Sequence, residues 1–284
     1  MLIKIKNKIF NGNALDVLKT FTEKSIDMAI TSPPYWGLRD YGIDGQLGLE
    51  PTFDLYIKHL CDIFDETKRV LKDEATLWVN IGDTYDKNKS LIGIPFRFAI
   101  EMINRGWILR NTLIWHKNSV MPSSVKDRFT LDFEYIFFFS MNKKYYFQQQ
   151  FEPHTSGDSN TTRLFRAGTK GHDTLMNKEI AHGKRSEKDD EDIIMRYGKH
   201  GRNKRTVWNV NTKPFKEAHF AVFPEALIET PILAGCPPKG IVLDMFMGAG
   251  TTGVVAKKNN RNYVGIELNQ EYIKIAENRI LSGL

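Results

Sequence analysis

Residues 242–253 read VLDMFMGAGTTG, an apolar run that passes directly into a glycine-rich turn. Three glycines, Gly248, Gly250 and Gly253, follow the spacing GxGxxG between a predicted strand and a predicted helix. Glycines let the backbone turn sharply and approach a ligand closely. Glu267 ends the next predicted strand, where a carboxylate can accept hydrogen bonds from both hydroxyls of a ribose. This stretch therefore predicts a nucleoside pocket in a fold of alternating strands and helices.

Two ligands compete for such a pocket, a dinucleotide and S-adenosyl-L-methionine. A dinucleotide fold needs a second mononucleotide half after the acidic residue, and only residues 268–284 follow Glu267. S-adenosyl-L-methionine needs one nucleoside half and space for its methionine tail, so the sequence favours it. In a third interpretation the glycines only ease the packing of strand on helix, and the matching Glu267 argues against that.

The rest of the chain alternates short apolar runs with amphipathic stretches. Alternation of Lys with Leu and Ile over residues 1–10 predicts an edge strand and not a signal peptide, since no long apolar stretch follows. Strands that alternate with helices predict an α/β fold, with a mostly parallel sheet covered by helices on both faces. The predicted strands are 26–31, 75–81, 107–115, 133–140, 241–246 and 262–267, and the predicted helices are 53–71, 94–104, 270–281 and one that opens at Phe223-Pro224-Glu225.

The bulk composition excludes several classes of protein. Of 284 residues 41% are hydrophobic, yet no run approaches the eighteen or so apolar residues of a membrane span. Cys61 and Cys236 lie far apart and lack a CxxC companion, which fits a reducing cytoplasm and predicts no disulfide framework. The seven histidines show no metal-ligand spacing, so we expect no metal site. The net charge of +6 suits a polyanion but decides little alone.

The apolar pattern lapses between residues 156 and 205. Gly, Ser, Asn and Lys dominate there, Lys and Arg residues are scattered through the segment, and an acidic run over 187–192 interrupts them. We interpret the segment as an inserted lobe, with a solvated loop as the alternative. These basic residues include Arg163, Arg166, Lys170, Lys178, Lys184, Arg185, Arg196, Arg202, Lys204 and Arg205.

A second motif, Thr31-Ser32-Pro33-Pro34-Tyr35-Trp36, follows the predicted strand 26–31. Consecutive prolines fix φ and supply no N–H, so we expect their carbonyls to point outward from a stiff platform. The platform lies at the carboxyl end of a strand, where open α/β sheets bind ligands. Ser32 can donate or accept a hydrogen bond, and Tyr35 offers a flat face for stacking. The alternative is a proline-terminated strand with a tyrosine in the core.

Together the two motifs resemble those of the amino-methyltransferases of restriction–modification systems. Ser32-Pro33-Pro34-Tyr35 is similar to the catalytic tetrad of that family, and residues 246–250 (FMGAG) are similar to its FxGxG cofactor motif. A tetrad that precedes the cofactor motif resembles the circularly permuted beta class. Residues 219–227 resemble the helix that flanks the methionine end of the cofactor there. Residues 115–117, 121–123 and 127–128 resemble a segment beside the target-base pocket.

The resemblance implies the class I methyltransferase fold in permuted form, with a seven-stranded sheet that contains one antiparallel strand. It implies a catalytic half over 1–150, a target-recognition insertion over 151–206 and a cofactor-binding half over 207–284. The expected catalytic residues are Ser32, Pro33, Pro34 and Tyr35. The residues expected to bind S-adenosyl-L-methionine are Asp244, Phe246, Gly248, Gly250, Thr251, Thr252, Glu267, Phe223 and Pro224.

The resemblance also implies an activity, since a tetrad that begins with Ser is mostly associated with N4-cytosine enzymes. The chain would methylate N4 of cytosine in double-stranded DNA after flipping the base, with N6 of adenine as the alternative. Tyr35 would stack on the base, while Ser32 Oγ and the Pro33 carbonyl would accept hydrogen bonds from its amino group. Further expected partners are a second copy of the chain, in a homodimer, and a cognate restriction endonuclease that shares the site. No membrane is expected.

One departure and two competing functions remain. Asn11-Gly12-Asn13 stands where members often carry Gly-Asp, which weakens the assignment of a carboxylate there. An RNA or small-molecule methyltransferase could use the same pocket, and a catalytically silent DNA-binding module could keep the fold. Asp83, after the strand 75–81, is expected to cap a loop.

Overall fold

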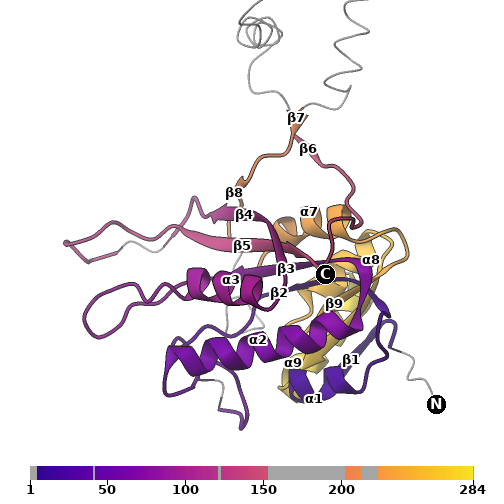
Figure 1. Cartoon of the computed structure of the whole chain (residues 1–284), viewed down its shortest axis with the longest axis horizontal. Helices are drawn as coiled ribbons and strands as arrows, with labels where there is room; N and C mark the ends of the chain where they lie inside the picture. Colours follow the sequence, from indigo (N-terminus) through magenta and orange to yellow (C-terminus); the bar gives the residue numbers. More distant parts are fainter. Residues whose placement is uncertain (1–4, 41, 121–122, 153–201, 213–222, 284) are drawn as a thin grey trace, which may run out of the picture. The chain divides into compact units, whose positions relative to one another are not determined.

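The computed structural model describes residues 5–40, 42–120, 123–152, 202–212 and 223–283 (Figure 1). The chain divides into two compact units, one of residues 1–148 with 206–284 and one of residues 149–205. The bounds of the smaller unit are close to those of the insertion expected over 151–206. Its described part pairs β6 (Phe151–Glu152) with β7 (Arg202–Asn203). Most of the predicted basic lobe lies outside the described residues.

An eight-stranded sheet forms the larger unit. β5 alone runs antiparallel to its neighbours, so the prediction of a mostly parallel sheet with one antiparallel strand is confirmed. The expected number of seven strands was one too low, because a three-residue strand carries too little pattern to be predicted. The order is β1 (Lys8–Asn11), β10 (Asn262–Glu267), β9 (Ile241–Asp244), β2 (Ile26–Thr31), β3 (Leu71–Ile81), β5 (Phe133–Ser140), β4 (Ile108–His116) and β8 (Val207–Asn209).

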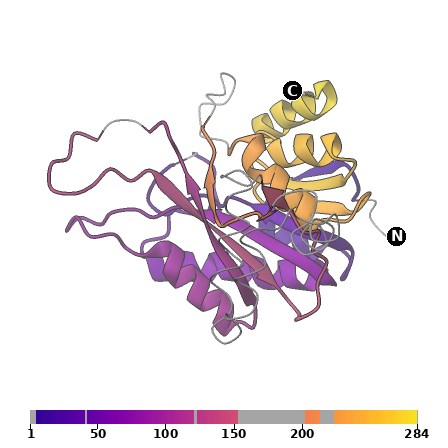
Figure 2. The same cartoon turned by 90° about the horizontal axis from the view of Figure 1, so that it is seen from above.

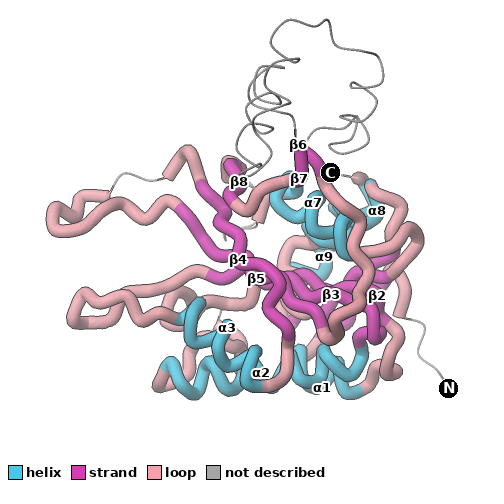
Figure 3. The backbone as a smooth tube through the Cα atoms, turned by 45° about the horizontal axis from the view of Figure 1, so that its top comes forward, coloured by secondary structure: helices cyan, strands magenta, loops and turns pink. Residues whose placement is uncertain are grey.

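Helices cover both faces of this sheet, as predicted (Figures 1 and 3). Alternate strand residues feed the two cores: Leu77 and Val79 of β3 face one side, and Trp78 faces the other. One face carries α1 (Ala14–Lys19), α2 (Phe53–Val70) and α3 (Ile94–Asn104), and the other carries α7 (Glu225–Gly235), α8 (Thr251–Lys258) and α9 (Gln270–Ser282). Among the described residues, none of these helices is long and apolar enough to cross a bilayer.

Long loops leave the sheet where β3 and β4 end, and they project from the same side in two views (Figures 1 and 2). One of them is fixed by Asp83, whose carboxylate accepts hydrogen bonds from the backbone N–H groups of Gly93 and Ile94. These groups start α3, which begins with Gly93 in a left-handed conformation and has no side-chain cap of its own. Asp83 is therefore a loop cap, as the sequence predicted.

Two of the three motif glycines serve the packing of helices. Gly250 has a φ of +82°, and a Cβ placed on it would lie 2.7 Å from Cβ of Ala276 in α9. A Cβ on Gly253 would lie 2.3 Å from the end of Ile280. The glycines thus allow α8 and α9 to approach closely, which was the third interpretation of the motif. A Cβ placed on Gly248 would have only one atom within 4 Å, the carbonyl oxygen of Phe246 at 3.9 Å, so the space beside Gly248 is open to a ligand.

Asp244 joins the two sequence motifs from beneath. Its side chain is 1% exposed, and its carboxylate accepts hydrogen bonds from Thr31 Oγ1 at 2.6 Å and Thr252 Oγ1 at 2.6 Å. The backbone N–H of Phe246 donates a third, at 3.0 Å. Burial raises the pKa of Asp244 from 3.8 to about 6, although these hydrogen bonds favour the charged form. One carboxylate therefore holds the end of β2 against the glycine turn.

The raised pKa of Asp244 predicts a dependence of stability on pH. Between pH 4 and pH 6 the unfolded chain loses this proton and the folded chain keeps it, so stability present below pH 4 is lost as pH rises through about 6. The loss amounts to roughly 3 kcal/mol for a shift of this size. In the Asp244→Asn variant, we expect the free energy of unfolding measured with urea to lack this fall between pH 4 and pH 7. An identical pH dependence in both proteins would contradict the prediction.

Candidate active site

A cavity of about 510 Å³ opens at the carboxyl ends of β1, β10, β9 and β2. This volume lies within the usual range for small-molecule sites. Residues from both sequence motifs line it: Ser32 and Pro34 from the proline motif, and Phe246 and Gly248 from the glycine turn. The structure thus brings the two motifs, more than 200 residues apart in sequence, onto one cavity.

Glu267 lies on the wall of this cavity where the sequence predicted a ribose acceptor. Its Oε2 accepts a hydrogen bond from the N–H of Gly248 at 2.8 Å, and its Oε1 accepts one from the N–H of Asn269 at 2.8 Å. Burial raises the pKa of the carboxyl group. Each oxygen of a carboxylate has a second lone pair, so two acceptor sites remain beside the two backbone bonds. The arrangement matches two adjacent hydroxyl groups.

The segment that departs from the family pattern also lines the cavity. The N–H of Gly12 donates to the carbonyl of Glu267 at 3.1 Å, which aligns β1 with β10. Asn13 caps α1 by accepting from the N–H of Leu15, and its Nδ2 lies 3.5 Å from the carbonyl of Gly45. An amide therefore occupies the position where members of the family often have a carboxylate.

Six residues expected to bind the cofactor do not line the cavity. Asp244 lies beneath it, and Gly250, Thr251 and Thr252 support α8, with Thr251 accepting a hydrogen bond from Arg279. Pro224 caps α7 and Phe223 packs against the core on that face. These two belong to the segment 219–227, whose first four residues lie outside the described residues. Spacing locates the turn in the sequence but does not separate residues that face a ligand from residues that support it.

The charge of the lining decides between the two nucleoside ligands. Glu50, Asp62 and Glu267 contribute carboxylates, and none of the described lining residues is Lys or Arg. A pyrophosphate would find no Lys or Arg among these side chains, whereas a sulfonium with an α-amino group would be attracted to the carboxylates. The cavity fits a cationic nucleoside and not a dinucleotide.

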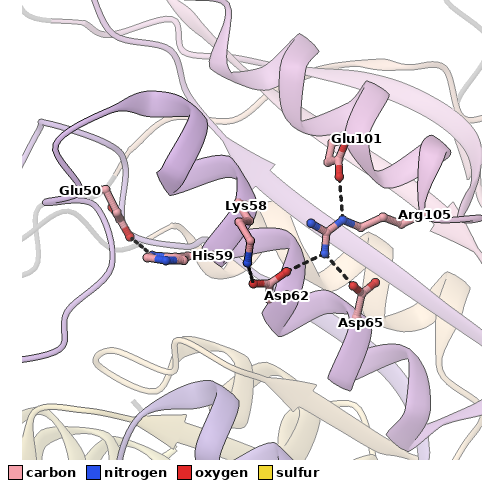
Figure 4. Close-up of polar contacts among 7 residues, drawn as sticks. All are labelled: Glu50, Lys58, His59, Asp62, Asp65, Glu101 and Arg105. Atoms are coloured by element: carbon pink, nitrogen blue, oxygen red, sulfur yellow. Dashed lines mark hydrogen bonds and ion pairs between the residues drawn. The ribbon is translucent and has the colours of Figure 1, made fainter.

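Sequence reasoning missed the contribution of α2 to this cavity. His59, Asp62 and Ile63 reach the lining from one helix face. His59 Nδ1 lies 3.2 Å from Glu50 Oε1, and Asp62 bonds to Lys58 and Arg105 (Figure 4). Arg105 also bonds to Asp65 and Glu101. The pattern of α2 predicted an amphipathic helix, but nothing in it marked the polar face as part of a site.

The proline motif is more closely tied to the protein than an open platform. The carbonyl of Pro34 accepts a hydrogen bond from the hydroxyl of buried Tyr56 at 2.8 Å, so it does not point outward as predicted. Pro33 is buried. Tyr35 does not line the cavity, and a Cβ on Gly82 would lie 2.8 Å from its ring. Ser32 is the member of the tetrad whose hydroxyl can serve both the cavity and the residues around Tyr35.

A polar cluster surrounds the hydroxyl of Tyr35, and of its members outside the tetrad only Lys117 belongs to a segment, 115–117, that the resemblance placed beside the target-base pocket. Tyr35 Oη donates to Glu134 Oε2 at 2.6 Å, and Asn80 Nδ2 donates to both oxygens, at 2.9 Å and 2.8 Å. Lys117 donates to Glu134 Oε1. Ser32 Oγ lies 3.4 Å from Tyr35 Oη and 3.4 Å from Asn80 Nδ2. Burial, followed by the charge of Glu134, raises the pKa of Tyr35 well above its usual value, so the phenol stays neutral.

The orientation of Asn80 is set by Glu134. Asn80 is 5% exposed, and its Oδ1 has no hydrogen-bond partner among the described residues. An unsatisfied buried acceptor costs about 1–3 kcal/mol, whereas a hydrogen bond to a charged group contributes about 1.5–3 kcal/mol. Turning the amide over would aim its carbonyl at a carboxylate that can only accept. The charge of Glu134 therefore holds the amide nitrogen inward and leaves the carbonyl unpaired.

Comparisons with known proteins agree with this geometry. A family model described as DNA methylase, for N6 and N4 methyltransferases, matches residues 26–278. The chain is 41% identical to the type II methyltransferase M.Cfr9I of Citrobacter freundii, over 96% of this chain and 87% of that protein. It is 40% identical to the type II methyltransferase M.SmaI of Serratia marcescens, over 96% of this chain and 90% of that protein.

Solved structures share the fold. The cytosine-N4-specific PvuII DNA methyltransferase superposes with a TM-score of 0.67 at 20% identity, covering 98% of this chain and 94% of that one. A DNA modification methylase of Thermus thermophilus, TTHA0409, in complex with S-adenosyl-L-methionine, gives a TM-score of 0.61 at 22% identity, with coverages of 97% and 95%. The permuted class I methyltransferase fold expected from the sequence is confirmed. With the match over 26–278 and the identity to type II enzymes, the chain belongs to the N6/N4 DNA methylase family of restriction–modification methyltransferases.

Proposed function

We propose that the chain transfers the methyl group of S-adenosyl-L-methionine to N4 of cytosine in duplex DNA after the base has left the stack. The observation that carries this proposal is the position of Ser32. Ser32 lines the cavity that fits a cationic nucleoside, and its Oγ lies 3.4 Å from Tyr35 Oη in the polar cluster. A donor of methyl and an acceptor amine can therefore meet at the carboxyl end of β2.

The residues of the cavity fit the cofactor. Glu267 would hold the ribose hydroxyls, Gly248 would allow close approach of the backbone, and Phe246 would pack on the nucleoside. When bound, S-adenosyl-L-methionine supplies a methyl group that the positive sulfonium already activates. Asp244, Gly250, Thr251 and Thr252 act indirectly, by keeping the turn and α8 in place.

The target amino group needs acceptors and not a strong base. Its lone pair is conjugated with the ring, and hydrogen bonds from its two N–H groups to Ser32 Oγ and the Pro33 carbonyl would favour a pyramidal nitrogen. Tyr35 would stack on the flipped base with its ring, while its hydroxyl stays bonded to Glu134. These residues supply orientation and electrostatics, since no covalent intermediate is required.

Cytosine is favoured over adenine by the residue that opens the tetrad. Ser32 stands where most N6-adenine members of the permuted class carry Asp. The related PvuII structure, which shares the fold, is described as cytosine-N4-specific. N6 of adenine is the second candidate, because both bases present an exocyclic amine of similar chemistry.

The segment 151–206 is proposed to recognise the target sequence, between a catalytic half over 1–150 and a cofactor-binding half over 207–284. Its surplus of Lys and Arg suits the phosphate backbone. A homodimer and a cognate restriction endonuclease that shares the recognition site remain part of the proposal.

The base specificity predicts a defined product. We expect unmethylated bacteriophage DNA incubated with the full chain and cofactor to yield N4-methylcytosine after digestion to nucleosides. Chromatographic separation with mass spectrometry distinguishes this nucleoside from C5-methylcytosine, which has the same mass. N6-methyladenine as the product would contradict the choice of base. Faster transfer to RNA than to DNA would contradict the substrate class.

Removal of the Ser32 hydroxyl should slow turnover and spare the cofactor. We expect Ser32→Ala to lower kcat by about 100-fold, a typical loss for one transition-state hydrogen bond. The Kd for S-adenosyl-L-methionine, measured by calorimetry, should stay within about twofold, because the carboxylate of Glu267 and the glycine turn are intact. The matched control is Ser25→Ala, which removes a hydroxyl at the opposite end of β2, where it donates to the carbonyl of Thr22. A Ser32→Ala enzyme with the kcat of the control would refute this role.

Neutralising basic residues of the insertion should weaken DNA binding in a salt-dependent way. We expect Lys184→Gln with Arg185→Gln to reduce the slope of log Kd against log salt by about 0.9 for each phosphate that the two side chains no longer neutralise. Lys19→Gln with Lys274→Gln removes the same charge from α1 and α9 and should leave the slope unchanged. Equal slopes for both double variants would show that the insertion does not contact the phosphates.

A further inference from the structure

The cluster around Tyr35 forms a chain of hydrogen bonds with a defined direction. Lys117 can only donate and an ionised carboxylate can only accept, so the contact between Lys117 and Glu134 fixes the first step. Tyr35 Oη lies 2.6 Å from Glu134 Oε2 and must give it the phenolic proton. Asn80 must present its amide nitrogen to the same oxygen. The proton positions in the cluster therefore follow from the charge of one residue.

This direction reaches Ser32. Because Tyr35 Oη donates its proton to Glu134, it can only accept a hydrogen bond from Ser32 Oγ, 3.4 Å away. The hydroxyl proton of Ser32 can then turn toward Tyr35. Asn80 Nδ2 donates to one lone pair of Ser32 Oγ at 3.4 Å, and the second lone pair stays available to a donor in the cavity that Ser32 lines. An amino group that brings N–H donors to Ser32 finds an acceptor there.

We propose that Glu134, held by Lys117, is a positioning residue that sets the direction of the Lys117–Glu134–Tyr35–Ser32 chain and thereby keeps Ser32 Oγ an acceptor for the target amino group. The inference rests on the proposed function, in which an exocyclic amine is the methyl acceptor. Glu134 does not line the cofactor cavity, so it acts through Tyr35 and not on the cofactor. Its side chain is 17% exposed and that of Lys117 is 19% exposed, which leaves the pair little access to water.

Glu134→Gln keeps the size and shape of the side chain and is expected to reverse the direction of the hydrogen bonds from Tyr35 to Ser32. Lys117 still donates, so the carbonyl oxygen of the new amide faces Lys117 and its NH₂ faces Tyr35 and Asn80. Tyr35 Oη then accepts, and its proton turns to Ser32 Oγ and occupies the lone pair that the target amine needs. We expect kcat to fall by about 10- to 100-fold, as for a misoriented catalytic group. The Kd for S-adenosyl-L-methionine should change by less than about twofold.

A second substitution should restore activity. In Lys117→Met with Glu134→Gln the donor is gone, so the amide is free to turn its carbonyl oxygen to Tyr35 and Asn80. We expect kcat to recover by about tenfold or more over the single variant. If the Lys117–Glu134 ion pair had only a structural role, the opposite result would be expected. Adding Lys117→Met to Glu134→Gln would then leave kcat unchanged or lower it further. The coupling between the two substitutions is what the double variant measures.

The reaction is followed as transfer of labelled methyl from S-adenosyl-L-methionine to unmethylated bacteriophage DNA, with KM for DNA measured beside kcat. Glu101→Gln is the matched control, because Glu101 is a glutamate of α3 that is ion-paired with Arg105 (Figure 4) and does not line the cavity. It should keep the kcat of the wild-type chain. Tyr35→Phe is the second test, and adding Glu134→Gln to it should cause no further fall, since no phenolic proton is left to reverse.

The outcomes separate the proposed activity from the role of Glu134. A wild-type chain that transfers no methyl to DNA contradicts the proposed function. An active wild-type chain with Glu134→Gln at the same kcat, or with a double variant that does not recover, overturns the role of Glu134 alone. A fall in kcat with unchanged cofactor Kd and recovery by Lys117→Met supports it.

Discussion

The rest of the site depends on the buried carboxylate of Asp244. It accepts hydrogen bonds from Thr31, which directly precedes the tetrad, and from Thr252 and the N–H of Phe246, which belong to the glycine turn. β2 and β9 are neighbours in the sheet, but pairing alone joins only Met28 and Ala29 to β9. The carboxylate of Asp244 extends the connection between β2 and β9 to the carboxyl ends of both strands. The distance between the proposed amine acceptor and the proposed cofactor floor is therefore set by one side chain.

The two halves of the site have complementary electrostatics. The cavity side carries carboxylates and no described Lys or Arg, which suits a cation. The target side carries a neutral phenol, a neutral amide and one glutamate whose charge is matched by Lys117. Ser32 lies between the cavity side and the target side, and its hydroxyl is uncharged. Such an arrangement favours transfer from a charged sulfonium to an uncharged amine without a strong base, because preorganised dipoles replace the solvent that would otherwise have to reorient.

Much of the fold could be predicted because its elements are local. The strands 26–31, 133–140 and 262–267 were predicted to the residue, since turn-forming residues bound each run. β3 begins earlier than expected, at Leu71, because Lys72, Asp73 and Glu74 interrupt the apolar pattern. Of the residues expected to bind the cofactor, Phe246, Gly248 and Glu267 line the cavity. The resemblance placed Lys117 beside the target-base pocket, but its contact with Glu134 and Asn80 could not be predicted, because these residues meet only through the register of β5 between β3 and β4.

The pairing of β1 with β10 joins Lys8 to Val264, nearly the whole chain apart. During synthesis on the ribosome, β1 leaves the exit tunnel long before its partner exists and waits as an unpaired segment. The cavity wall formed by Gly12 and Asn13 needs Glu267 for alignment, so it is completed only when the last strand has emerged. Long-range closure of this kind slows folding. It also means that a nascent chain without β10 lacks the alignment of this wall of the cavity.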